Sequence, residues 1–363
     1  MKTIKNKTGF VVITTFLCLV SLCSPGSYAA QTSESSSVAP ALNHLKQGRM
    51  QEAIAYLQDL LKKNTTDVKA RQVLANVYFS SNEIKKAEKT YLEVLKMEPN
   101  AETYNNLGVL YLKEENAQKA VESFQKAVEL DPNFTRAYFN LGELSLISGK
   151  FPMALAFFKK AETIDKNHPL VHYKLGVSLT KTGRLEEALK EFEEAVKQDP
   201  ENLRIKTDFG MAYMAARKFD KAQAEFQKVT AKAPRSTIAH FGMGLALKAT
   251  GQKEKAVESF QKAYEFSPGF IDPYLEAGDL LRKLGRAPEA IAAYQKTIPL
   301  YENTLKQDPK NSLAHLKFAK VLIHTRHFKE AKKHLKDVQK LEKEKGPLAA
   351  QTMVLMEKIK NEA

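Results

Sequence analysis

The chain has 363 residues, 43% of them apolar and 27% charged, an ordinary composition for a protein with a sizeable buried core. Its 56 Lys plus Arg residues exceed the 42 Asp plus Glu residues by 14, which favours anionic partners: nucleic acid, anionic lipid, acidic polysaccharide or acidic protein. Both cysteines, Cys18 and Cys23, lie in an N-terminal segment that we expect to be removed, which excludes disulfides, thiol nucleophiles and thiolate metal sites from the mature chain.

That segment, residues 1–29, has the features of a secretory signal peptide. Three lysines precede an apolar stretch at 9–23, and Ser27-Tyr28-Ala29 supplies a small residue–x–alanine cleavage site, so we expect cleavage near Ala29. An uncleaved membrane anchor is the alternative, although a membrane span needs about 20 apolar residues. Export to the periplasm or cell envelope argues against nucleic acid as the partner. Residues 30–40 are rich in serine and predict a flexible linker.

A period of 34 residues governs the rest of the chain. It appears at Gly108, Gly142, Gly176, Gly210, Gly244 and Gly278; at Ala120, Ala154, Ala188, Ala222, Ala256 and Ala290; and at Phe124, Phe158, Phe192, Phe226, Phe260 and Tyr294. Apolar residues at helical spacing predict two helices in each period, and prolines end the second helix. Glycine inside a helix costs about 1 kcal/mol. We expect this cost to be offset because the missing Cβ lets the second helix approach closely.

This pattern resembles the tetratricopeptide repeat family. Residues 101–134 match the family pattern at Tyr104, Leu107, Gly108, Tyr111, Ala120, Phe124, Ala127 and Pro132. The resemblance implies an all-α, right-handed superhelical solenoid of helix-turn-helix repeats in an exported bacterial protein. We place the solenoid at 41–345, with nine repeats at 34–67 (degenerate), 68–100, 101–134, 135–168, 169–202, 203–236, 237–270, 271–311 and 312–345. Residues 346–363 predict a capping helix that covers the open end with Leu348, Leu355, Met356 and Ile359.

The repeat at 271–311 is seven residues too long, which equals about two helical turns. The extra residues fall in its second helix, which also contains Pro299. We expect one longer, kinked helix rather than two helices separated by a turn.

No motif in the sequence indicates catalysis or a cofactor. There is no Gly-rich phosphate loop after a strand and no Gly-x-Ser-x-Gly nucleophile elbow. His172 and His240 occupy the bulky first-helix position that Tyr104 fills elsewhere, so we expect them to pack between helices. Four further histidines gather near the C-terminus: His315, His324, His327 and His334. Glu330 is the near carboxylate, and we expect a solvated helix end and no metal site there.

The positive charge is concentrated toward the C-terminus. Lysines at helical spacing line one face of the last repeat's second helix, at Lys329, Lys333, Lys336, Lys340 and Lys343. A solvated outer face is the simpler interpretation of this basic face. The alternative is docking to lipid headgroups or an anionic polysaccharide.

The resemblance also implies where a protein partner would bind, because the first helices of this family line a concave groove that holds a peptide. The apolar residues at the groove positions are Phe139, Leu146, Ile147, Tyr173, Val177, Met211, Met214, Ile238, Phe241, Leu245 and Leu275. A run of exposed apolar side chains marks an interaction site. Packing between adjacent repeats is the alternative for each residue.

Asparagines lie beside this predicted groove. Asn106 and Asn140 occupy the sixth position of successive repeats, where some family members bind a peptide backbone through a ladder of asparagines. Asn76, Asn106 and Arg136 also match a family clamp for a C-terminal carboxylate, but Gln72 and Asn140 replace expected basic residues. The sequence therefore predicts a non-enzymatic scaffold for proteins or peptides, serving secretion, pilus, outer-membrane or exopolysaccharide machinery.

Overall fold

The computed structural model describes residues 37–166, 168, 170–342 and 346–362. The predicted signal peptide, most of the predicted linker and Lys343 of the basic face lie outside these residues. The end of the linker was wrongly expected to be flexible, because a helix already begins at Ala39. Pro40 fits the first turn of that helix, where a missing backbone N–H costs nothing. The Tyr56 hydroxyl also donates to the Ser37 carbonyl at 3.1 Å and holds the chain there.

The described chain is built of helices and contains no strand in these residues. It divides into an N-terminal lobe, up to Gln198, and a C-terminal lobe, from Asp199. The N-terminal lobe contains α3 (Ala39–Lys46), α4 (Met50–Lys63), α5 (Val68–Ser80), α6 (Ile84–Met97), α7 (Ala101–Lys113), α8 (Ala117–Leu130), α9 (Thr135–Ile147), α10 (Phe151–Ile164), α11 (Val171–Lys181) and α12 (Leu185–Gln198). The C-terminal lobe contains α13 (Leu203–Ala215), α14 (Phe219–Lys232), α15 (Thr237–Ala249), α16 (Lys253–Phe266), α17 (Ile271–Lys283), α18 (Ala287–Gln307), α19 (Ser312–His324), α20 (Phe328–Glu342) and α21 (Ala349–Glu362).

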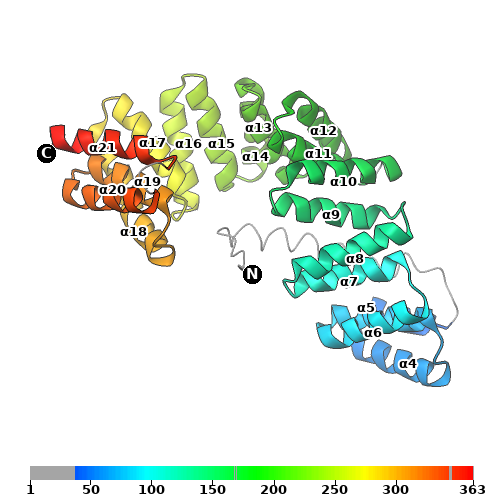
Figure 1. Ribbon diagram of the computed structural model, residues 1–363. Helices are drawn as coiled ribbons and strands as arrows, with labels where there is room; N and C mark the ends of the chain where they lie inside the picture. Colours follow the sequence, from blue (N-terminus) through cyan, green and yellow to red (C-terminus); the bar gives the residue numbers. More distant parts are fainter. Residues whose placement is uncertain (1–36, 167, 169, 343–345, 363) are drawn as a thin grey trace. The chain divides into compact units, whose positions relative to one another are not determined.

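Successive helices pack as pairs, and each pair also packs against the next within its lobe. Figure 1 shows α7 and α8 lying side by side as one such pair. Odd-numbered helices from α5 to α19 are the first helices of their repeats, and even-numbered ones are the second. Both lobes therefore have the architecture of a helical repeat solenoid, as the sequence predicted.

The glycine–phenylalanine contact is the packing rule that repeats along both lobes. A Cβ placed on Gly108 would lie 2.6 Å from the Phe124 ring, and one on Gly244 would lie 2.5 Å from the Phe260 ring. Both rings are fully buried. A carbon–carbon contact that short is strongly repulsive, so only glycine allows the second helix to place its ring there. The expected role of these glycines is confirmed.

The turn inside each repeat depends on one residue in the left-handed region. Gly149 has φ +70° and Glu115 has φ +58° at equivalent positions. Glycine adopts this conformation without steric cost, whereas a side chain such as that of Glu115 adds strain. The backbone then reverses within a few residues, and the second helix begins against the first.

The long repeat is accommodated by one long helix. Helix α18 has 21 residues and continues through Pro299, whereas the other second helices from α4 to α16 have 14. No turn interrupts α18, so the expectation of a longer helix is confirmed.

The C-terminal helix α21 lies against α19 and α20. Leu348, Leu355 and Met356 are partly buried against the core of the C-terminal lobe, and Ile359 belongs to that core. None of the helices in the described part of the chain is both long and apolar enough to cross a membrane.

Candidate binding surface

A continuous chain of hydrogen bonds joins the first helices α5, α7 and α9. The Asn106 amide donates to Asn76 Oδ1 at 3.2 Å, and the Asn105 amide donates to Asn106 Oδ1 at 3.4 Å. The Asn140 amide donates to Asn105 Oδ1 at 2.9 Å. At the other end, the Tyr91 hydroxyl donates to Asn76 Oδ1 at 2.7 Å. We call this chain the asparagine row.

The asparagine row lies inside the N-terminal lobe. Asn105, Asn106 and Asn140 are buried, and Asn76 is half-buried. Buried amide groups need partners, and here they satisfy one another. Asn106 and Asn140 therefore link repeats together, and the sequence missed Asn105 as their intermediary. The sequence feature that could have revealed Asn105 is its polar amide at the fifth repeat position, where the next repeat has Phe139.

A buried ion pair follows the asparagine row in the next repeat. Lys174 Nζ on α11 lies 2.9 Å from Glu143 Oε2 on α9, and their side chains are only 9% and 3% exposed. The other carboxylate oxygen of Glu143 is buried without a hydrogen-bond partner. The ammonium group of Lys174 also lies 5.2 Å from the Tyr173 ring centre, a cation–π contact. Lys174 occupies the repeat position of Asn106 and Asn140, so a charge replaces an amide in this row.

Phe139 and Tyr173 do not form an exposed apolar surface, which corrects the expectation for these two residues. Both are buried. Phe139 packs edge-on against Phe158, with ring centres 5.4 Å apart, and Tyr173 packs in the same way against Phe192 at 6.2 Å. Each ring thus packs on the second-helix ring of its own repeat, and His168 also lies against Phe139, with ring centres 4.9 Å apart.

Among the predicted groove residues, two on first helices of the C-terminal lobe remain exposed. Met211 is 37% exposed and Ile238 is 48% exposed. With their half-buried neighbours they form what we call the apolar row: Met211, Met214, Ile238, Phe241, Leu245 and Leu275, on α13, α15 and α17. Helix α13 contacts α15, so the first two helices of the apolar row are neighbours.

The remaining predicted groove residues are only partly accessible. Leu146 and Val177 are half-buried, and Leu146 packs against the core of the N-terminal lobe. Ile147, at the end of α9, is 37% exposed. The guanidinium group of Arg136 lies 5.1 Å from the Phe134 ring centre and makes no hydrogen bond to the asparagine row among the described residues. Of the predicted carboxylate clamp, Asn76, Asn106 and Asn140 thus lie together in the asparagine row, bonded to protein groups.

The basic face is exposed on α20. Lys329, Lys333, Lys336 and Lys340 point to solvent, whereas Ala331, Leu335 and Val338 on the same helix are buried in the core. None of these four lysines forms an ion pair with an acidic residue of the described chain. Their charge is therefore available to an anionic partner.

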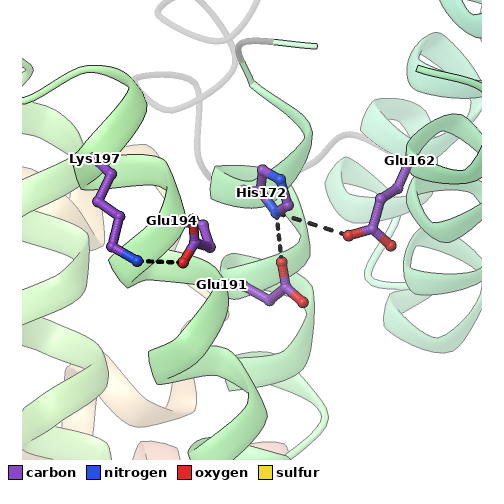
Figure 2. A network of polar contacts seen from close by, with 5 residues as sticks. All are labelled: Glu162, His172, Glu191, Glu194 and Lys197. Atoms are coloured by element: carbon purple, nitrogen blue, oxygen red, sulfur yellow. Dashed lines mark hydrogen bonds and ion pairs between the residues drawn. The ribbon is translucent and has the colours of Figure 1, made fainter. Parts of the chain in front are cut away.

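His172 lies between two carboxylates of the N-terminal lobe. Its Nδ1 atom is 2.8 Å from Glu191 Oε2 on α12 and 3.7 Å from Glu162 Oε1 on α10. Figure 2 shows the two carboxylates reaching the imidazole from helices on either side, while Glu194 turns away to Lys197. The expectation that His172 packs at a helix contact is met, with a polar partner rather than an apolar one.

Three family models match the chain. One, described as the C-terminal domain of cilia and flagella-associated protein 70, matches residues 21–243, which is more than half of the chain. Two tetratricopeptide repeat models match residues 238–270 and 292–353.

Individual relatives match shorter or more divergent stretches of the chain. Two human proteins, RanBP2-like and GRIP domain-containing proteins 3 and 4, are 43% identical over 61 residues, which are 16% of this chain and 3% of theirs. The chain thus spans only a small part of these curated relatives. The structure of Pseudomonas aeruginosa PilF is 22% identical, covers 56% of this chain and 93% of its own, and gives a TM-score of 0.51. A structure of the APC/C hetero-tetramer Cut9–Hcn1 is 16% identical. The match covers 96% of this chain and 66% of that one, with a TM-score of 0.52. Both structures support the fold.

Proposed function

Because the chain belongs to the tetratricopeptide repeat family, we propose that it is a binding scaffold that holds a protein or peptide partner on its first helices. The observation that carries this proposal is the apolar row of the C-terminal lobe. Met211 and Ile238 expose more than a third of their surface, and four half-buried apolar residues lie on the same three first helices. Contiguous apolar surface of this kind marks interaction sites.

The composition of the apolar row indicates the chemistry of the partner. Two methionines give a flexible, polarisable surface that adapts to differently shaped apolar side chains. Phe241 offers an aromatic face beside them. We therefore expect a partner segment that presents two or more large apolar side chains as anchors, and we expect no enzymatic activity.

The test is selection from a displayed peptide library on the purified full chain. The wild-type chain should enrich peptides with spaced apolar anchors. The double variant Met211→Glu/Ile238→Glu should bind the same peptides at least about tenfold more weakly, because each buried charge costs more than 1 kcal/mol. The matched control is Leu130→Glu, which alters a residue 49% exposed on second helix α8. Equal affinity of wild type and double variant would refute the proposal.

We place the scaffold in the periplasm or cell envelope, where it would assemble secretion, pilus, outer-membrane or exopolysaccharide machinery. The support is the sequence pattern of residues 1–29. Residues 1–36 fused to a reporter should direct it out of the cytoplasm and be cleaved near Ala29. A reporter retained inside the cell at full length would contradict export, and an exported but uncleaved one would favour the membrane anchor.

A second candidate function is binding of an anionic polysaccharide or membrane surface through the basic face. Four exposed lysines that pair with no acidic residue of the described chain favour it. Binding to anionic vesicles should weaken steeply between low and high salt and disappear in the triple variant Lys333→Glu/Lys336→Glu/Lys340→Glu. Three exposed lysines of α16, Lys253, Lys255 and Lys262, serve as the control set for charge reversal. Salt-insensitive binding would exclude this function.

A further inference from the structure

We propose that His315, His334 and Asp337 form a site for a divalent transition metal such as Zn²⁺ in the last repeat. The ligand atoms of these three residues all lie within 4.8 Å of one another. His315 Nδ1 is 2.8 Å from His334 Nδ1 and 4.0 Å from Asp337 Oδ2. Two imidazoles and a carboxylate are a donor set that suits zinc.

The orientation of the His315 ring is the strongest support for this metal site. Its Nε2 atom lies 3.1 Å from the Pro309 carbonyl oxygen, which can only accept, so Nε2 bears the proton. In the neutral ring Nδ1 is then left with its lone pair, and it points at His334. A backbone carbonyl that fixes the tautomer in this way is the usual support of a metal-binding histidine. His315 is only 7% exposed, so the ring has little freedom to turn away.

The two other ligands come from one face of α20. His334 and Asp337 are three residues apart, so a helix places them side by side. The His334 ring packs against Phe318, with centres 4.7 Å apart, and Phe318 is itself buried. Burial and the neighbouring His315 lower the pKa of His334. Lys333 adds to this lowering, while Asp337 and Glu330 oppose it.

The geometry needs small adjustments to hold an ion. Ligand atoms of a tetrahedral zinc lie about 3.3 Å apart, given metal–ligand distances near 2.0–2.1 Å. The two imidazole nitrogens would separate by roughly half an ångström and the carboxylate would approach by a little more. Asp337 is 41% exposed at its side chain and can make that movement. The fourth position would face water.

A comparison within the chain separates this cluster from ordinary packing. His240 occupies the same repeat position as His315, and its Nε2 atom also meets a proline carbonyl, that of Pro234, at 2.8 Å. The residue equivalent to His334 in that repeat is Ser259, whose hydroxyl donates to a carbonyl of its own helix. The tautomer-fixing bond is thus a repeat feature, and only the second imidazole and the carboxylate make it a ligand set.

The test measures zinc bound per chain by equilibrium dialysis, on the full chain purified without an affinity tag. The wild-type chain should bind one equivalent. His334→Gln should weaken binding by roughly 30-fold or more, and Asp337→Asn by about tenfold, because each removes a ligand. His327→Gln is the matched control, since His327 is exposed nearby and contacts Thr325. His172→Gln controls for the cluster of Glu162, His172 and Glu191.

Every outcome of this experiment either supports or overturns the proposed zinc site. Full zinc binding by both controls together with weakened binding by the ligand variants supports the site. Unchanged binding by His334→Gln, loss of binding by His172→Gln or His327→Gln, or no binding by the wild type would overturn it. Circular dichroism checks folding, and if His334→Gln fails to fold, Asp337→Asn decides alone because it alters a partly exposed side chain without changing its size.

Discussion

The first helices of the two lobes carry different side chains at several equivalent repeat positions. In the N-terminal lobe, the fifth, sixth and ninth positions include the asparagine row and the Lys174–Glu143 pair, which are mostly buried. In the C-terminal lobe, the fifth and ninth positions include Met211, Phe241, Leu245 and Leu275, which remain partly accessible. The glycine–phenylalanine contact is the same in both. The repeat therefore separates the residues that build the fold from those that vary. The variable residues link repeats inside the N-terminal lobe and leave apolar side chains partly accessible in the C-terminal lobe.

The largest effect should come from breaking the buried ion pair of the N-terminal lobe. Lys174→Met would leave the Glu143 carboxylate buried without a counter-charge, which costs about 3–5 kcal/mol of unfolding free energy. Denaturant unfolding followed by circular dichroism measures it. The control is Lys126→Met, which breaks an ion pair exposed at both partners and should cost less than about 1 kcal/mol. Equal losses in the two variants would show that the Lys174 pair is not structurally important.

The glycine contact should be equally sensitive in both lobes. Gly108→Ala and Gly244→Ala each place a Cβ against a buried ring, and we expect each to cost about 1–3 kcal/mol despite alanine's better helix propensity. Gly269→Ala is the control, because a Cβ there meets nothing within 4 Å. A cost in only one lobe would mean that the shared packing rule does not hold across the chain.

The sequence predicted the constant part of the molecule well. The period of 34 residues predicted the helix pairs. A glycine and an aromatic residue recur together in it, as at Gly108 and Phe124, and this recurrence predicted their contact. The variable part was harder to predict, because a single sequence does not tell whether an apolar first-helix residue packs against a ring or faces solvent. Phe139 and Phe241 look identical in the sequence, yet Phe139 is buried and Phe241 is half-buried. The meeting of His315 with His334 likewise depends on the facing of two helices.

A smaller loss should follow from interrupting the asparagine row. Asn140→Ala removes the amide that donates to Asn105 Oδ1 and leaves that buried oxygen without this donor. An unsatisfied buried acceptor costs about 1–3 kcal/mol, and we expect the lower half of this range because Asn105 still donates to Asn106. Asn133→Ala, at an exposed turn position, should change the denaturation midpoint little. If the two variants behave alike, the row contributes no stability.

The smallest expected effect concerns the two rings that cover Phe139 and Phe241, which differ between the lobes. His168 lies over Phe139, with ring centres 4.9 Å apart, whereas the equivalent Phe270 lies over Phe241 at 5.1 Å. Burial lowers the pKa of His168 from its usual value of 6.5, against the opposing charge of Asp165.

Because the unfolded chain takes up this proton at a higher pH than the folded chain, the contribution of His168 to stability is complete above about pH 6.5 and declines as the pH falls below it. Replacing the imidazole by the ring used in the other lobe, in His168→Phe, should remove this part of the acid sensitivity and leave stability at pH 8 nearly unchanged. Thermal unfolding at pH 8 and pH 5.5 measures both. The same pH dependence in variant and wild type would mean that His168 already accepts its proton without disturbing Phe139, and the two aromatic contacts would then be equivalent.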